Sequence, residues 1–151
     1  MRRELKFRNF NDARKELERL GPGPVETTGL WSYYQILTHC ALGFENSMKG
    51  IEREMSWWKK HVSGPLRFQG MVLKGSIPMG IKGNPQTTYT ERVEGDAKAA
   101  MDKLLQVMAE FEKFEGKISI HPRVGKLSKK NWLRFHALHL ANHLGYTKLK
   151  D

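Results

Sequence analysis

The sequence predicts an all-α protein that folds as a four-helix bundle. Four separate segments carry apolar residues at helical spacing, capping or helix-breaking residues bound them, and no segment alternates in the manner of a strand. Amphipathic helices of this length bury their apolar stripes best by packing around a common centre. A chain of 151 residues suits one such core. We therefore expect a single helical domain over residues 1–151.

The first helix is expected over residues 11–20. Asn11 and Asp12 suit an N-cap, and the apolar residues that follow recur three or four positions apart. The run Gly-Pro-Gly-Pro at 21–24 then stops the helix.

The second helix is expected from about residue 31 to residue 48. Its apolar residues, including Cys40 and Phe44, fall on one helical face. Met48, Ile51, Met55 and Trp58 continue the spacing, so the helix is a candidate to extend to Trp58, although glycines at 43 and 50 disfavour this.

Residues 63–90 predict a long loop between the second and third helices. The segment holds five glycines and three prolines and lacks sustained periodicity. Long loops in compact domains often carry function, so this one is a candidate lid or pocket wall, and a peripheral insertion is the equal alternative.

The third and fourth helices have the clearest boundaries. Asp96 suits the N-cap of a helix that begins at Ala97 and runs through Phe111. Ser128 is placed to cap a last helix over 129–144, which ends near a glycine at 145.

Three histidines of the last helix lie on the face that should point into the bundle. At helical spacing, His136, His139 and His143 fall within about 60° of one another, and Trp132 lies on the same stripe. Each buried imidazole without a partner would cost about 1–3 kcal/mol. Their ring nitrogens therefore require partners.

A divalent metal ion is one way to satisfy these nitrogens. His139 and His143, four residues apart, can direct two ring nitrogens at one ion, whereas His136 and His143 lie about 10.5 Å apart along the axis. His39 of the second helix is the natural third ligand. The alternative is a core network of hydrogen-bonded histidines, in which His136 orients a ligand or only packs.

Two other residues near these motifs have weaker claims to a functional role. Cys40 adjoins His39 but lies on the apolar face, where a buried cysteine usually acts as a small hydrophobic residue. His121, in the segment before the last helix, either lines the site or belongs to a turn, and the turn is favoured.

These motifs resemble the DinB/YfiT-like superfamily, and especially a branch described as a domain of unknown function. The resemblance runs from the second helix to the C-terminus. It rests on W-S-x-x-Q-I-L-x-H at 31–39, H-P-x-x-G-K-L at 121–127 and the His-rich last helix at 132–144.

The resemblance implies a DinB-like four-helix bundle, often a homodimer, with a divalent metal that is commonly zinc or nickel. Carried over to this sequence, the metal ligands are His39, His139 and His143. Asn142 stands where relatives usually have another histidine, so it joins His136 and His121 as a residue expected near the pocket. Characterised relatives include metal-dependent hydrolases and thiol transferases that act on small molecules.

Composition narrows the alternatives. No apolar run approaches the roughly 20 residues that a membrane span needs, no export signal is visible and the single cysteine forms no internal disulfide, so a cytoplasmic protein is expected. The net charge of +10 keeps open a basic binding module for nucleic acid or an acidic partner. Because the cations are spread along the chain, nucleic-acid binding is not favoured over a metal-dependent enzyme. A third hypothesis is a metal that only clamps two helices.

Overall fold

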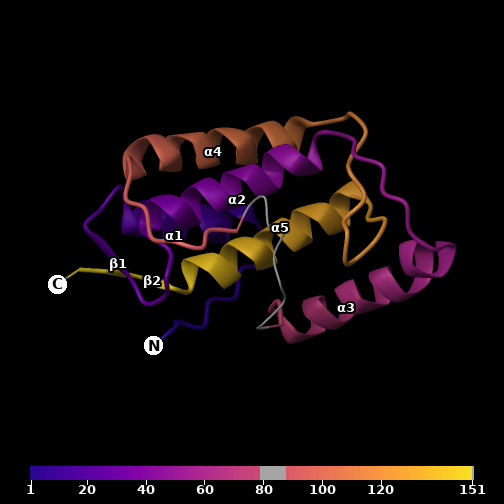
Figure 1. The fold of residues 1–151 in the computed structure, drawn as a ribbon, viewed down its shortest axis with the longest axis horizontal. Coiled ribbons are helices and arrows are strands. Elements are labelled where there is room, and N and C mark those ends of the chain that lie inside the picture. The colour runs from indigo at the N-terminus through magenta and orange to yellow at the C-terminus, as the bar shows by residue number, and fades with distance from the viewer. Residues whose placement is uncertain (79–87, 151) are drawn as a thin grey trace.

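The computed structural model describes residues 1–78 and 88–150, and these residues are mostly helical (Figure 1). They form five α-helices, one π-helical turn and a two-stranded antiparallel sheet. In chain order the elements are α1 (Phe10–Leu20), β1 (Val25–Thr27), α2 (Tyr33–Ser47), η1 (Lys59–Ser63), α3 (Gly64–Lys74), α4 (Ala97–Lys113), α5 (Lys129–Leu144) and β2 (Thr147–Leu149).

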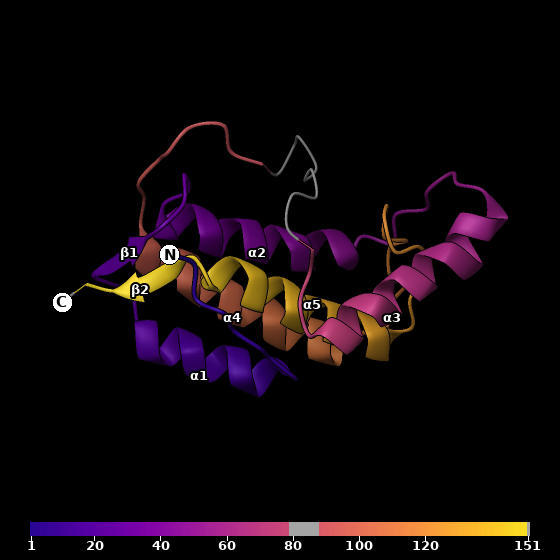
Figure 2. The same ribbon diagram turned by 90° about the horizontal axis from the view of Figure 1, so that it is seen from below.

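Helices α1, α2, α4 and α5 pack around one hydrophobic core. Helix α2 contacts both α4 and α5, and α1 contacts the same two helices from the other side. In the core, the aromatic ring of Phe44 from α2 packs edge-on against Phe10 of α1 and near Phe111 of α4. Figure 2 shows α3 extending away from these helices at the end opposite β1 and β2.

All four predicted helices occur close to their expected bounds. Helix α1 begins at Phe10 because the side chain of Asn9, rather than Asn11, accepts a hydrogen bond from the backbone of Asp12. Asp96 caps α4 and Ser128 caps α5, as predicted.

The second helix, expected over about 31–48, does not continue to Trp58. Helix α2 ends at Ser47, and residues 51–56 are not helical. Gly50 has a positive φ of 65°, a left-handed conformation that interrupts a helix and that glycine adopts without strain. The extension to Trp58 is therefore wrong, and Trp58 is 62% exposed instead of buried in the core.

The prediction of a continuous loop over 63–90 is also wrong, because α3 occupies residues 64–74. Pro65 stands in the first turn of α3, where its missing N–H breaks no helical hydrogen bond, and Gly75 ends the helix in the left-handed conformation. Phe68 and Met71 are buried, so packing against the core stabilises a helix that composition disfavours. Residues 79–87 of the expected loop lie outside the described residues.

The small sheet was not predicted. Residues 25–27 pair antiparallel with residues 147–149, and three-residue strands are too short for a recognisable alternation. The sheet joins the segment before α2 to the segment after α5.

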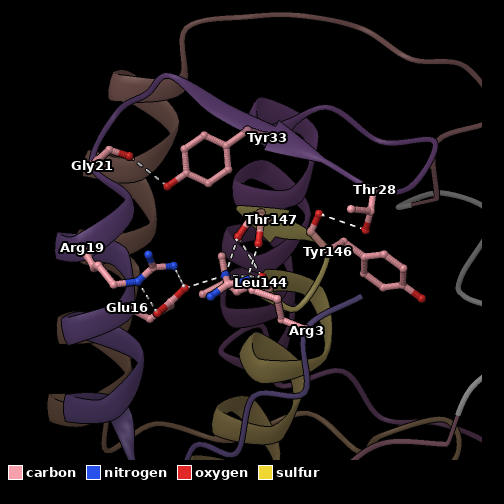
Figure 3. A network of polar contacts seen from close by, with 9 residues as sticks. All are labelled: Arg3, Glu16, Arg19, Gly21, Thr28, Tyr33, Leu144, Tyr146 and Thr147. Carbon is pink, nitrogen blue, oxygen red and sulfur yellow. Dashed lines mark hydrogen bonds and ion pairs between the residues drawn. The ribbon is translucent and has the colours of Figure 1, made fainter. Parts of the chain in front are cut away.

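A polar network around Arg3 fastens the N-terminal segment beside β2 (Figure 3). The guanidinium of Arg3 donates to the carboxylate of Glu16 at 2.6 Å, to the Thr147 hydroxyl at 3.1 Å and to the Leu144 carbonyl at 3.2 Å. Arg19 donates to the same carboxylate at 2.8 Å. The end of α5 is thereby held against α1.

Among the described residues, no helix combines the length and the apolar character required to cross a membrane.

Candidate metal centre

The start of α2 sets the position of His39. Ser32 is the N-cap, and its side chain and that of Gln35 form a capping box with each other's backbone N–H groups. The side-chain amide of Gln35 also donates to the carbonyl of Glu91 at 2.8 Å. His39 follows Gln35 by one helical turn, so its ring leaves the same side of the helix. The W-S-x-x-Q part of the motif therefore fixes the helix that carries the histidine.

Helix α5 supplies two further histidines to the same point. His139 and His143 are four residues apart, so both rings lie on one face of the helix, where they meet edge to face at 4.6 Å. Gly43 of α2 lies opposite His139, and a methyl group at this glycine would stand 3.5 Å from the His139 ring. This is ordinary van der Waals contact, and it shows that α2 and α5 lie close together at the level of their histidines.

The three imidazoles form a compact cluster, and in the described residues they are the group of side chains suited to hold a metal ion. One ring nitrogen from each of His39, His139 and His143 lies within 4.8 Å of the other two. The Nε2 atoms of His39 and His139 are 3.2 Å apart. Nitrogens on a tetrahedral zinc ion are separated by about 3.3 Å, so this spacing fits a shared ion.

The electrostatics of the cluster favour neutral rings. Burial lowers the pKa of His139 well below its usual 6.5, and the rings of His143 and His39 lower it further. Burial also lowers the pKa of His143 to about 3, with His39 and Arg2 contributing. Neutral imidazoles keep the lone pairs that a metal requires. The donor set is therefore compatible with a divalent transition-metal ion.

Trp31 covers the cluster, a role that the sequence analysis did not assign to it. Its indole ring lies parallel to His143 at 5.4 Å and 4.8 Å from the ring of His39. The indole N–H donates to the carbonyl of Tyr89 at 3.0 Å, which fixes the ring. The signal available in the sequence was its place directly before the N-cap of α2, two turns ahead of His39.

The histidine cluster opens into a cavity of about 530 Å³. Aromatic and aliphatic side chains such as Trp132, Phe135 and Met71 form much of its wall. Arg53, Arg123 and five histidines also line it, whereas no aspartate or glutamate does in the described part of the chain. Cavities of this size and apolar character typically bind small molecules.

His136 lies deeper than the cluster and does not join it. Its ring stacks on Phe44 at 4.0 Å, and its Nε2 lies 3.0 Å from the hydroxyl of Ser47. Ser47 donates its own proton to the Phe44 carbonyl, so His136 Nε2 must be the donor in this pair. Burial lowers the pKa of His136 to about 3. This histidine is a neutral core residue.

Asn142 and His121 both line the cavity. The side-chain oxygen of Asn142 accepts a hydrogen bond from Arg2 at 2.7 Å. His121 belongs to a turn in which its Nδ1 accepts from the backbone N–H groups of Arg123 at 3.0 Å and Val124 at 3.2 Å. His121 therefore belongs to the turn and also lines the cavity.

The H-P-x-x-G-K-L motif has a structural explanation in this turn. His121 and Gly125 exchange two backbone hydrogen bonds of 3.0 Å. Gly125 has a positive φ of 73°, and a side chain there would come within 2.6 Å of the Lys60 carbonyl. Only glycine fits this close contact between the turn and η1.

Cys40 takes no part in the site. Its side chain is fully buried in the core, and burial raises the pKa of the thiol far above its usual value. A thiol in this environment is neither nucleophilic nor a ready metal ligand.

Comparisons with known proteins place the chain in a family. A family model described as "Protein of unknown function (DUF1569)" matches residues 1–149. Searches of curated proteins and of solved structures return no significant match. Because the match covers nearly the whole sequence, the chain belongs to the DUF1569 family.

Proposed function

We propose that the protein is a divalent-metal-dependent enzyme that acts on a small molecule. The observation that carries the proposal is the meeting of His39, His139 and His143 at the wall of a cavity of about 530 Å³. Three protein ligands leave coordination positions for water or substrate, which distinguishes catalytic sites from closed structural ones.

A divalent ion at this site would polarise a carbonyl group or lower the pKa of a bound water or thiol towards neutrality. The protein's own residues would shield the metal ligands and exclude water. Trp31 shields two of the ligand rings from solvent, and the apolar walls exclude water from the substrate. The described lining offers histidines rather than a carboxylate as a proton acceptor.

The resemblance to DinB/YfiT-like proteins extends this proposal. It favours zinc or nickel as the metal, a DinB-like bundle made by α1, α2, α4 and α5, and a homodimer. It also favours hydrolysis or thiol transfer as the reaction. The packing of α2 between α4 and α5 and the position of the three histidines support this extension.

Metal binding by matched variants tests the proposal. We expect the purified parent protein to bind one equivalent of zinc or nickel in calorimetric titrations, and His39→Ala and His143→Ala to lose most of that affinity. His61→Ala removes an exposed histidine outside the cavity and is the control. Absence of stoichiometric binding by the parent would refute the proposal.

A metal that only clamps α2 to α5 is the alternative use of the same site. In that case chelation would unfold the protein or lower its melting temperature, and a panel of esters, amides and thiol acceptors would show no turnover. We expect turnover of at least one compound class that chelator abolishes and added metal restores.

A basic binding module remains the second candidate, because one surface feature favours it. Trp57 and Trp58 are 69% and 62% exposed, and Lys59 and Lys60 follow them in the chain. Exposed aromatic rings beside cations are typical of single-stranded nucleic-acid platforms. Filter binding to random DNA and RNA at two salt concentrations tests it: undetectable binding at low salt would exclude this function.

A further inference from the structure

The cavity has a second polar end, separated from the histidine cluster by an aromatic ring. Phe135 lies parallel to His139 at 6.1 Å and also contacts the ring of His121 at 4.6 Å. Arg53 lines the cavity beside His121, and its Nε donates to the carbonyl of Ile120 at 2.9 Å. The hydrogen bond fixes the arginine at this wall.

The hydrogen bonds of the turn determine what His121 can offer a ligand. Its Nδ1 accepts two backbone N–H groups, so the ring proton must be on Nε2. Burial lowers the pKa of His121 to about 3, with Arg53 and Arg123 contributing, and the ring stays neutral at physiological pH. His121 therefore presents a fixed N–H donor from the cavity wall.

Arg53 adds the donors that are specific for an anion. Its Nε is used by Ile120, and in the described residues no carboxylate lies within 4.0 Å of its guanidinium, which leaves the terminal nitrogens for a ligand. Arg53 lies between this cavity and an outer pocket that Glu52 and Glu54 also line, but Glu52 pairs with Lys117 at 2.6 Å and neither glutamate lines the cavity. The planar fork of an arginine matches the two oxygens of a carboxylate.

The charge of the whole cavity also favours an anionic ligand. Its described lining contains two arginines and no acidic side chain, and three neutral histidines would leave the charge of a divalent ion uncompensated. Such a site attracts anions and disfavours cations. The wall between the two ends is apolar and aromatic, which suits the uncharged middle of an organic molecule.

We propose that Arg53 and His121 bind the carboxylate of a small organic acid whose uncharged end reaches the histidine cluster. The binding itself requires no metal. That this acid, an organic monoanion with an apolar body, is also the class of substrate rests on the proposed function.

Nuclear magnetic resonance titrations of chelator-treated, metal-free protein test the assignment. The probes are phenylacetate and its neutral counterpart phenylacetamide, which share an aromatic body. Hydrogen bonds to charged groups predict that phenylacetate binds the parent protein at least about tenfold more tightly than phenylacetamide. Arg53→Gln should remove this preference. Arg53→Lys, which keeps the charge but loses the fork, should retain part of it.

Arg67→Gln is the matched control. It removes the same charge from a residue that bonds the Arg123 carbonyl but does not line the cavity, so the preference should persist. Equal affinities of the two probes for the parent, or an unchanged preference in a folded Arg53→Gln variant, would overturn the assignment. Phenylacetate binding that occurs only after metal loading would also overturn it, while supporting the metal site. Selective binding by a protein that takes up no metal would support it and refute the proposed function.

Discussion

Replacing His136 with phenylalanine should reduce the sensitivity of the protein to acid. In the folded state burial lowers the pKa of His136 from 6.5 to about 3, so between these values the unfolded chain binds a proton that the folded protein excludes. Falling pH therefore favours unfolding, and the stability that the neutral ring preserves at pH 7 is lost progressively below pH 6.5.

The magnitude follows from the size of the shift. One pKa unit corresponds to about 1.4 kcal/mol, so acidification from pH 6.5 to pH 4.5 should cost the parent about 2–3 kcal/mol through this one residue. Phenylalanine can keep the stacking on Phe44, and Ser47 keeps its bond to the Phe44 carbonyl. His136→Phe should therefore remove this pH-dependent contribution to the free energy of unfolding and keep the packing against Phe44.

Urea unfolding of metal-free protein at pH 7.0, 5.5 and 4.5, followed by circular dichroism, measures the effect. The free energy of unfolding of the variant minus that of the parent should be about 2–3 kcal/mol larger at pH 4.5 than at pH 7.0. Comparing the two proteins at each pH removes the contributions that they share. The exposed His61, replaced by glutamine, is the control. A parent–variant difference that does not change with pH would refute the reasoning.

Three further predictions concern the supports of the site. Gly125→Ala should destabilise the protein by about 2–4 kcal/mol in urea unfolding, because it combines a left-handed backbone with a methyl group 2.6 Å from the Lys60 carbonyl; an undiminished midpoint would show that the turn relaxes. Arg3→Ala should cost about 1–3 kcal/mol at pH 7. Although burial alone would raise the pKa of Glu16, hydrogen bonds from Arg19 and Arg3 lower it, so the ion-pair part of this cost should be lost as pH falls below about 4.5, whereas the part from the bonds to Thr147 and Leu144 remains; a cost that does not change with pH would contradict the ion-pair account. Trp31→Ala should weaken metal binding about 10–100-fold in calorimetric titrations while leaving the circular dichroism spectrum unchanged, and unaltered affinity would show that the indole only covers the cavity.

Sequence patterns located a helix best where its capping residue and its apolar stripe indicate the same starting point. Asp96 and Ser128 cap α4 and α5 as their positions suggested. Helix α3 escaped detection because its glycines and proline conceal a pattern of only two buried side chains, and its stability comes from tertiary contacts. The three-residue strands depend on a partner more than a hundred residues away, which local patterns do not reveal.

The histidine cluster was accessible to sequence reasoning because helical geometry is regular. The four-residue spacing of His139 and His143 places both rings on one face, and the inward face of α2 contains His39. Other parts of the site depend on the path of irregular segments. Arg53 reaches the cavity only because residues 51–53 run beside 119–121, joined by the bond from Ile120 N–H to the Ile51 carbonyl.

X-ray absorption spectroscopy of the protein loaded with one equivalent of zinc would show whether the three histidines share the ion. We expect a first shell of nitrogen and oxygen atoms at about 2.0–2.1 Å, with outer-shell scattering from three imidazoles in the parent and from two in His139→Ala. A parent spectrum with fewer than three imidazoles, or one that His139→Ala leaves unchanged, would mean that the three histidines do not share an ion.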